Sequence, residues 1–582
     1  MWLRPLLVCL GCLLVVRPCQ ADSPPDPLRF LPASADLLIK IEKPAALFKQ
    51  IAADPIVGEI AQLDAVREAY DSTTARRLYQ LLSYLERELG VDRWTLFENL
   101  TSGGAALSAK IDGDKSPVTM VIQGRDETLW RRALQIGLEV VEQELARKEQ
   151  KERPVHTVYR RIDTVAIGKD FHVAVAGSAL VFSNKEASLH QAIDCLLDPK
   201  AKTLATKPEV KQAHDLAGAD ASGWMWFNLP LVRAFPAAKP IFEMPRNDPN
   251  LTVLFGGWLD VAQHAPFLCA GGTLTSTESK LSFRMPRDLA KSAPAMRLNI
   301  PPAGTAGTRP LLEPKGVLFS SSFYLDLAAL WENRAQLFNE AQRKTFEEFD
   351  KSSSRVLLGS TFSKLVTQTA PYHRVVVAHQ PTYAYKSTPQ QNIPAFAYVA
   401  ELRDPESFGK RIDAILRAAG LLASAATRLK PQIFEETYAG QKIVGYRFSE
   451  SAPQANDPTN LRFNFVPCYV RVGNQFLACS TLNLCHEMID LLLVEAKKPP
   501  TTTARDASVL QFYGSGGALI LNYYKDVVLT QNILDNANTP DQANKQVNDV
   551  MQLVRKLGVF RIESRYTDKD FQYNLRFVPT RK

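Results

Sequence analysis

After its first residues, this 582-residue sequence contains no long apolar run, so we expect no later segment to span a membrane. A strong excess of one charge is also missing. The 69 Lys and Arg residues against 61 Asp and Glu give a formal net charge of only +8. Basic runs with interleaved aromatic residues are absent as well. Nucleic-acid binding needs a concentrated basic patch, so this composition argues against a nucleic-acid partner.

Cysteine is scarce, with eight residues in the whole sequence, three of them (Cys9, Cys12 and Cys19) near the start. None of the others forms a Cys-x-x-Cys pair or lies at zinc spacing from a histidine, so we expect no metal ion and no cofactor. A chain of this size builds a core without disulfides, and we interpret these cysteines first as small buried apolar side chains. A disulfide among Cys468, Cys479 and Cys485 is the alternative, and the pairing stays open. The later cysteines are Cys195, Cys269, Cys468, Cys479 and Cys485.

The familiar catalytic motifs are incomplete. The sequence HEMID at 486–490 approaches the zinc-protease pattern, but that pattern needs histidine where Asp490 stands. Residues 101–104 (TSGG) lack the Gly-Lys-Ser/Thr ending of a phosphate loop, and residues 513–517 (YGSGG) lack the Gly-x-Ser-x-Gly spacing. We therefore predict no catalytic residues and expect that the protein is not an enzyme.

The first 21 residues have the features of a signal peptide. Arg4 supplies a positive charge, residues 6–16 (LLVCLGCLLVV) are apolar but too short to span a bilayer, and residues 19–21 (CQA) suit signal peptidase. We expect export to the periplasm or the extracellular space, with a mature chain from Asp22. A retained or lipidated envelope anchor is the alternative.

One stretch of the sequence occurs twice, at residues 172–197 and 468–493. When Gly473 is placed on Gly177, the two stretches align without a gap. The alignment places His486 on His190, Ile489 on Ile193, Asp490 on Asp194, Leu492 on Leu196 and Leu493 on Leu197.

Other residues extend this repeat over most of the chain. Arg403 follows Arg125 by 278 positions, whereas Gly473 follows Gly177 by 296, so the second half contains an insertion between these points. The polar residues 449–460 (SESAPQANDPTN) are its expected site, because loops accept insertions.

The same alignment continues toward the end of the chain. It places Asn522 on Asn228 and Arg576 on Arg284. The apolar residues 518–521 (ALIL) therefore take the position of the aromatic strand expected at 223–228 (GWMWFN).

We predict an α+β protein of two homologous domains, each a largely antiparallel sheet with helices packed on one face. The domains are expected at 22–288 and 312–582, joined by a Pro- and Gly-rich linker at 289–311. The pattern does not give the strand order. Strands are predicted at 104–111, 118–123, 155–160, 163–168, 171–176, 179–183, 223–228, 267–275 and 279–286, and helices at 44–52, 94–100 and from 127 to about 150.

The repeated His-x-x-x-Asp pattern is the most specific chemical candidate. His190 and Asp194, like His486 and Asp490, are four residues apart and would share a helix face. Such a pair could bind a metal ion or act as an acid and base, and a polar pair with a structural role is the simpler interpretation.

The aromatic strand offers a second candidate. Alternation sends Trp224 and Trp226 to one face of the strand and Met225 and Phe227 to the other. We interpret this as a buried central strand, and an apolar ligand groove is the alternative.

Residues 31–36 (LPASAD) run directly into the strand-like residues 37–41 (LLIKI). Together with the repeat and the signal peptide, this opening resembles a group of exported bacterial proteins of unknown function. The mature chains of that group begin with a Leu-Pro-Ala-x-x-acid segment that runs into a strand. The resemblance implies an envelope location and a non-catalytic role, and it carries over no site residues.

We therefore expect an exported, non-catalytic binding or scaffold protein of the bacterial cell envelope, whose partner is another envelope protein or surface component. The alternatives are a carrier of an apolar ligand such as a lipid, and a metal-dependent hydrolase that uses the His/Asp pairs. A carrier predicts an internal apolar cavity, and a hydrolase predicts polar groups that converge on a pair. A scaffold predicts an exposed apolar or aromatic patch.

Overall fold

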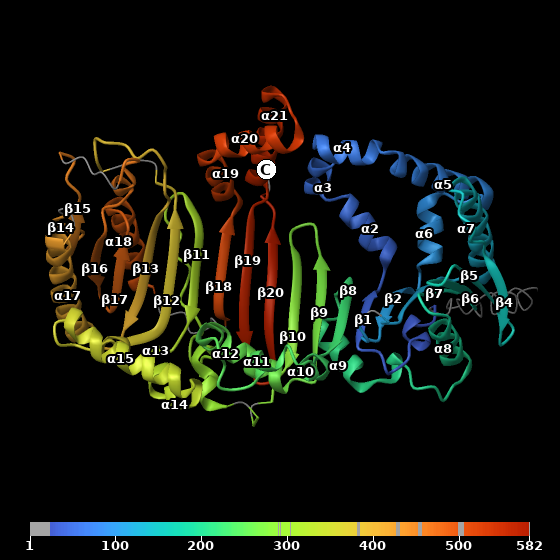
Figure 1. Cartoon of the computed structure of the whole chain (residues 1–582), viewed down its shortest axis with the longest axis horizontal. Coiled ribbons are helices and arrows are strands. Elements are labelled where there is room, and N and C mark those ends of the chain that lie inside the picture. The colour runs from blue at the N-terminus through green and yellow to red at the C-terminus, as the bar shows by residue number, and fades with distance from the viewer. Residues whose placement is uncertain are drawn as a thin grey trace, which may run out of the picture. The chain divides into compact units, whose positions relative to one another are not determined.

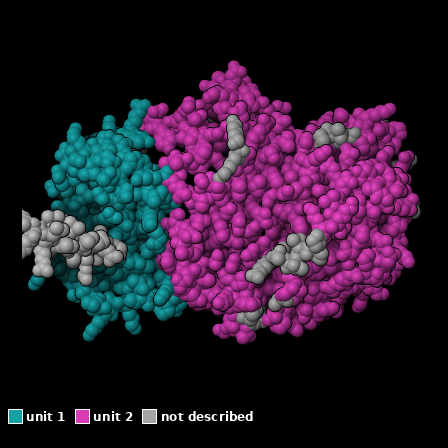
Figure 2. Space-filling view, turned by 180° about the vertical axis from the view of Figure 1, so that it is seen from behind, with its two compact units in different colours: residues 1–49, 76–211 teal, residues 50–75, 212–582 magenta. Residues whose placement is uncertain are grey.

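The computed structural model describes residues 24–580 except 114, 289, 292, 303, 381–383, 427–430, 452–456 and 499–505. It is 44% helix and 26% strand, which confirms the α+β class (Figure 1). The expected signal peptide lies outside the described residues, as does part of the insertion at 449–460. The chain divides into two compact units, which are described separately: unit 1 comprises residues 1–49 and 76–211, and unit 2 comprises residues 50–75 and 212–582 (Figure 2).

Unit 1 contains an antiparallel sheet in the order β1-β2-β3-β7-β6-β5-β4. Its strands are β1 (Leu37–Ile41), β2 (Gly104–Ala109), β3 (Val118–Gln123), β4 (Val155–Tyr159), β5 (Ile162–Ile167), β6 (Phe171–Ala176) and β7 (Ala179–Ser183). Helices of the first half are α2 (Pro44–Ala52), α3 (Pro55–Ile60), α4 (Asp64–Asp71), α5 (Thr73–Leu89), α6 (Arg93–Leu100), α7 (Glu127–Arg147), α8 (Glu186–Leu197) and α9 (Pro208–Ala217). The predicted strands 118–123, 171–176 and 179–183 and the helix 44–52 are confirmed to the residue.

Unit 2 contains an antiparallel sheet in the order β8-β9-β10-β20-β19-β18-β11-β12-β13-β17-β16-β15-β14. Its strands are β8 (Gly223–Asn228), β9 (Phe267–Leu274), β10 (Ser279–Pro286), β11 (Val317–Tyr324), β12 (Thr369–Ala378), β13 (Ala395–Leu402), β14 (Gln432–Tyr438), β15 (Gln441–Arg447), β16 (Cys468–Val472), β17 (Gln475–Cys479), β18 (Asp506–Tyr513), β19 (Val559–Tyr566) and β20 (Asp570–Val578). The longer helices are α12 (Pro249–His264), α15 (Glu340–Val356), α17 (Pro405–Ala426), α18 (Leu482–Ala496), α19 (Gly514–Tyr523), α20 (Lys525–Asn536) and α21 (Pro540–Lys556).

Local sequence signals explain where several of these elements begin and turn. The Asp126 carboxylate accepts hydrogen bonds from the backbone N–H groups of Thr128 (2.8 Å) and Leu129 (3.2 Å), so Asp126 is the N-cap of α7 as expected. Gly177 (φ 58°) and Gly473 (φ 60°) form the tight turns of the repeated hairpins β6–β7 and β16–β17. Only glycine adopts this left-handed conformation without strain.

The strand order of unit 1 recurs within unit 2, as β11-β12-β13-β17-β16-β15-β14. The register recurs too. Gln123 lies opposite Ala179 in the first set, and Glu401 lies opposite Gln475 in the second. Glu401 follows Gln123 by 278 positions and Gln475 follows Ala179 by 296, which are the two offsets seen in the sequence. Internal duplication of one domain stays a prediction, which this repeated order and register support.

The insertion falls where the sequence placed it. In the first set, β5 ends at Ile167 and β6 begins at Phe171, whereas in the second β15 ends at Arg447 and β16 begins only at Cys468. The extra residues therefore lie in the connection that includes 449–460.

Two expectations about the second half are wrong. Residues 518–521 are not a strand, because they lie in helix α19. The counterpart of β8 is β18, because β18-β19-β20 forms a meander as β8-β9-β10 does. Asn522 is consequently not the counterpart of Asn228. A short apolar run does not reveal by periodicity whether it is a strand or a buried helix. Here Gly516 lets the helix approach β11 closely, since a Cβ at this position would come within 2.7 Å of the Leu318 Cα atom.

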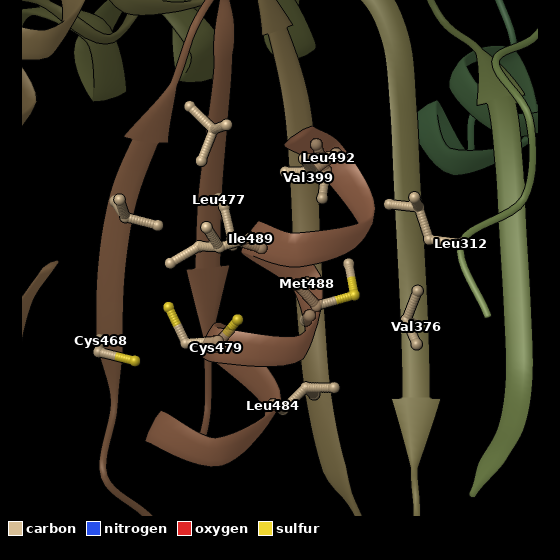
Figure 3. Close-up of a cluster of buried hydrophobic side chains, with 14 of the residues drawn as sticks. Leu312, Val376, Val399, Cys468, Leu477, Cys479, Leu484, Met488, Ile489 and Leu492 are labelled. Carbon is tan, nitrogen blue, oxygen red and sulfur yellow. The ribbon is translucent and has the colours of Figure 1, made fainter. Parts of the chain in front are cut away.

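Helices also cover both faces of the sheet near β16 and β17, not one face as expected. On one face, α17 packs through Phe408 against Phe476, and its Asp413 accepts a hydrogen bond from the Tyr469 hydroxyl (2.9 Å). On the other face, α18 packs through Met488 and Ile489 against the buried side chains of the same strands (Figure 3).

Part of the segment expected as a linker is packed into unit 2, to which it belongs. Residues Pro294–Asn299 form a 3₁₀ turn whose Ala295, Met296 and Leu298 are buried with Leu337 and Phe338. Apolar burial of this kind fixes a connection in place.

Two meanders, β8-β9-β10 and β18-β19-β20, meet through the antiparallel pair β10–β20. Ser282 lies opposite Asn574, and the Ser282 hydroxyl donates to the Asn574 side-chain oxygen (2.7 Å). These residues differ by 292 positions, the same separation as Arg284 and Arg576. Ser282 and Asn574 are thus equivalent positions that face each other, and the positions on either side of them are related by a local two-fold axis.

Candidate functional site

The structure places each predicted His/Asp pair beneath a tyrosine. On α8, the His190 ring stacks on the Tyr159 ring, with centroids 3.8 Å apart and planes 8° apart. The Tyr159 hydroxyl lies 3.0 and 3.1 Å from the two Asp194 carboxylate oxygens and donates to that carboxylate. Arg160 forms an ion pair with Asp194 at 2.7 Å.

The second half has the same arrangement on α18. The His486 and Tyr438 rings stack with centroids 4.0 Å apart and planes 12° apart, and the Tyr438 hydroxyl donates to Asp490 (2.9 Å). This hydrogen bond raises the pKa of Tyr438. The Nε2 atom of His486 also lies 2.8 Å from a carboxylate oxygen of Glu436.

In both places one tyrosine, which is the last residue of β4 or β14, contacts both the histidine and the aspartate of the pair. The stacking covers a face of the imidazole and the hydroxyl engages the carboxylate, so the arrangement fastens a hairpin to a helix. Within the described ranges, no three His, Cys, Asp or Glu side chains are grouped so as to hold a metal ion. Sequence reasoning missed the tyrosines, although Tyr159 and Tyr438 both immediately precede a turn and lie 279 positions apart.

A polar pocket of about 390 Å³ lies beside His486, at the first turn of α18. The His379 ring, which also lines it, is hydrogen-bonded to the Tyr523 hydroxyl. Gln380 is 8% exposed, and its Oε1 atom has no hydrogen-bond partner among the described residues. The pocket can hydrogen-bond a small polar molecule. It is lined by Lys315, Gly316, Ala378, His379, Gln380, Ala395, Thr481, Asn483, Leu484, His486 and Glu487.

The aromatic strand β8 belongs to the core. Trp224 and Trp226 are 4% and 2% exposed, and the Trp224 ring packs 5.1 Å from the His214 ring. Met225 and Phe227 on the other face are partly exposed. The interpretation as a buried strand is confirmed for the tryptophans, which therefore do not line an open groove.

An exposed apolar feature lies elsewhere on unit 2 and was not predicted. Side chains at directly opposed positions form a row across β13, β12, β11, β18, β19 and β20, which we call the aromatic row. Its members are Phe396, Val377, Phe319, Phe512, Phe560 and Phe577.

The rings of the aromatic row contact one another across the strands. The Phe319 and Phe512 centroids are 4.9 Å apart, and those of Phe512 and Phe560 are 6.4 Å apart. Phe396, Phe512 and Phe560 are 51%, 43% and 39% exposed. The next row on the same face is also mainly apolar and includes Val375, Leu510, Ile562, Leu575 and Leu281.

On β12 and β13 the face opposite the aromatic row carries buried apolar residues such as Val376 and Ala397, whereas on β18, β19 and β20 it includes polar residues. Gln511, Glu563 and Asn574 are buried there, and Glu563 forms ion pairs with Arg561 (2.6 Å) and Arg576 (3.3 Å). Alternation along each strand separates the two kinds of side chain. On β18, β19 and β20 the large apolar side chains of the aromatic row are therefore on the face that is more exposed to water, the reverse of an ordinary surface strand.

Comparison with known proteins identifies no family. No family model matches the sequence, and no curated protein matches it. Among solved structures, crystal form III of TP0453 aligns with 47% of this chain and 84% of its own at 10% identity and a TM-score of 0.23. Crystal form IV aligns with 46% and 83% at 9% identity and a TM-score of 0.24, and crystal form I with 46% and 80% at 8% and 0.23. Similarity at this level assigns neither a fold nor a function.

The helices of the described part include none that is both long and apolar enough to cross a bilayer.

Proposed function

We propose that this chain is an exported, non-catalytic binding protein of the bacterial cell envelope and that the aromatic row is its binding surface. The observation that carries the proposal is the exposure of Phe396, Phe512 and Phe560 on one continuous row. A phenylalanine presents on the order of 200 Å² of apolar surface, so these three leave roughly 250 Å² in water. At about 25 cal/mol per Å², covering that area contributes roughly 6 kcal/mol before the costs of association.

The kind of partner follows from the shape and charge of the surface. An apolar small molecule needs a concave site that buries most of its surface, whereas the row stands on the open face of a sheet. The row contains no charged side chain. We assign it a protein partner in the envelope that presents an uncharged, apolar face, as aromatic-rich interface cores do.

Export and envelope location are supported by the leader at residues 1–21 and by the family resemblance of residues 31–41. A hydrolase based on the His/Asp pairs gains no support, because Tyr159 and Tyr438 engage both members of their pairs.

Site-specific photo-crosslinking in the native host tests this proposal. The photoreactive amino acid p-benzoylphenylalanine replaces Phe512 in the full-length protein. The matched control carries it at Phe349 of α15, which is 52% exposed and lies outside the row. We expect a discrete protein adduct in the envelope fraction from position 512 and none from position 349.

Each other outcome counts against the assignment. A lipid adduct at position 512 would favour the carrier, and an adduct with a second copy would make the row a dimer interface. Equal or absent crosslinking at the two positions would overturn the row as a binding surface.

A further inference from the structure

The three cysteines of the second half lie together in the core formed by α18 and the strands beneath it. Cys468 on β16 is directly opposite Cys479 on β17 (Figure 3). Cys485 lies in the first turns of α18, which packs on those strands. Their exposed fractions are 4%, 4% and 0%. All three are free thiols.

The side chain of Cys485 lies beside those of Cys468 and Cys479. The thiols of Cys468 and Cys479 both donate to the sulfur of Cys485, which favours a thiolate there and lowers the pKa of Cys485. The Cys468 thiol also lies 3.7 Å from the backbone oxygen of Thr481. Cys485 is therefore the central member of the cluster, with two possible disulfide partners beside it.

The fold does not require thiols at these positions. The first half has the same strand order and register there, and a shift of 296 positions places His172, Ser183 and Leu189 where the second half has its three cysteines. The cysteine cluster is thus an addition to a core that other side chains fill equally well.

A pocket lies next to the cluster, although none of the three cysteines lines it. The polar pocket of about 390 Å³ is lined by Thr481, Leu484 and His486, which flank Cys485 along the first turns of α18. A molecule of the size of water or hydrogen peroxide can enter such a space.

We propose that this cluster is a peroxide-oxidised disulfide site in which Cys485 is the attacking thiol. The Cys485 thiolate attacks one peroxide oxygen and breaks the O–O bond, which gives a sulfenic acid and, with a proton, one water. The thiol of Cys468 or Cys479 then attacks the Cys485 sulfur, forms the S–S bond and releases the second water. Two thiols lose two electrons, and one peroxide gains them.

The disulfide would join the first turns of α18 to β16 or β17. That turn also carries His486 and one wall of the polar pocket, so oxidation would alter the pocket and the helix that carries the His/Asp pair.

The test treats the folded full-length protein with hydrogen peroxide, blocks the remaining thiols with iodoacetamide and maps peptides without reduction. We expect the loss of two thiols and a peptide that links Cys485 to Cys468 or Cys479. The variant Cys195→Ser, which changes a half-exposed cysteine on α8, should behave like the wild type. The variant Cys485→Ser should lose no thiol within the cluster.

A second variant keeps the result decisive if Cys485→Ser does not fold. With both Cys468→Ser and Cys479→Ser, the sulfenic acid on Cys485 has no partner, and dimedone should trap it as a stable adduct. The proposal is overturned if the wild type keeps its thiols while folded, or if oxidation links Cys468 to Cys479 and leaves Cys485 free.

Discussion

Removing the carboxylate of Glu495 should strongly destabilise the second-half core. Glu495 lies in the last turn of α18 and accepts a hydrogen bond at 2.8 Å from Arg374, whose side chain is only 2% exposed. Arg374 also donates to Gln475 and, at 3.2 Å, to the backbone oxygen of Pro310. Burial lowers the pKa of Arg374, and the negative charge of Glu495 opposes that effect. The variant Glu495→Ala therefore leaves a buried guanidinium without its counter-charge.

The magnitude follows from the burial of the two partners. Removing one partner of a buried ion pair lowers the free energy of unfolding by about 3–5 kcal/mol. Since Glu495 is 22% exposed and two acceptors remain for Arg374, we expect a value near the lower limit, about 3 kcal/mol. A loss of this size makes amide hydrogen exchange in β12 and α18 about 100-fold faster where exchange occurs through opening of this core.

Hydrogen exchange with mass spectrometry measures this effect locally, without assuming that the whole chain unfolds in one step. The double variant Arg374→Met with Glu495→Leu removes both charges and should recover most of the protection. The control is Glu340→Ala, which breaks an exposed pair with Lys344 (3.0 Å) and should change the free energy by less than about 0.5 kcal/mol. The reasoning is refuted if Glu495→Ala exchanges at the rate of Glu340→Ala in β12 and α18.

Three further effects can be measured by denaturant unfolding. Burial lowers the pKa of His373, so the unfolded chain binds a proton at a higher pH than the folded chain, and stability should fall as the pH drops below the ordinary histidine value of 6.5. The variant His373→Gln should weaken this acid dependence, whereas the exposed His156→Gln should not. Alanine at Gly177 or Gly473, where φ is positive, should cost about 1 kcal/mol. Alanine at Gly137, within α7 and with no atom near its Cβ position, should instead stabilise by up to about 1 kcal/mol, and equal effects at the three glycines would contradict this account.

Local signals made much of the fold predictable. Alternating apolar residues bounded by turns placed β3, β6 and β7 to the residue, and Asp126 marked the start of α7. The repeat gave offsets of 278 and 296 residues, which the strand register reproduces. These features depend on neighbours in the sequence.

Features that depend on distant segments were missed or mistaken. The sequence predicts a strand at residues 518–521, although they are helical, because a short apolar run has the same pattern in either structure. The aromatic row joins residues as far apart as Phe319 and Phe577, and it becomes visible only when the strand order is known. The tyrosines that engage the His/Asp pairs also come from hairpins distant from the helix, although Tyr159 and Tyr438 recur at matching positions.

The central claim is that a protein partner covers the aromatic row in the cell envelope. Hydroxyl-radical footprinting with mass spectrometry tests it on the unmodified protein, purified and in intact envelopes. The account predicts that Phe396, Phe512 and Phe560 oxidise readily in the purified protein and are protected in the envelope, whereas Phe349, which is 52% exposed, oxidises equally in both. Equal oxidation of the row in both samples would contradict the account.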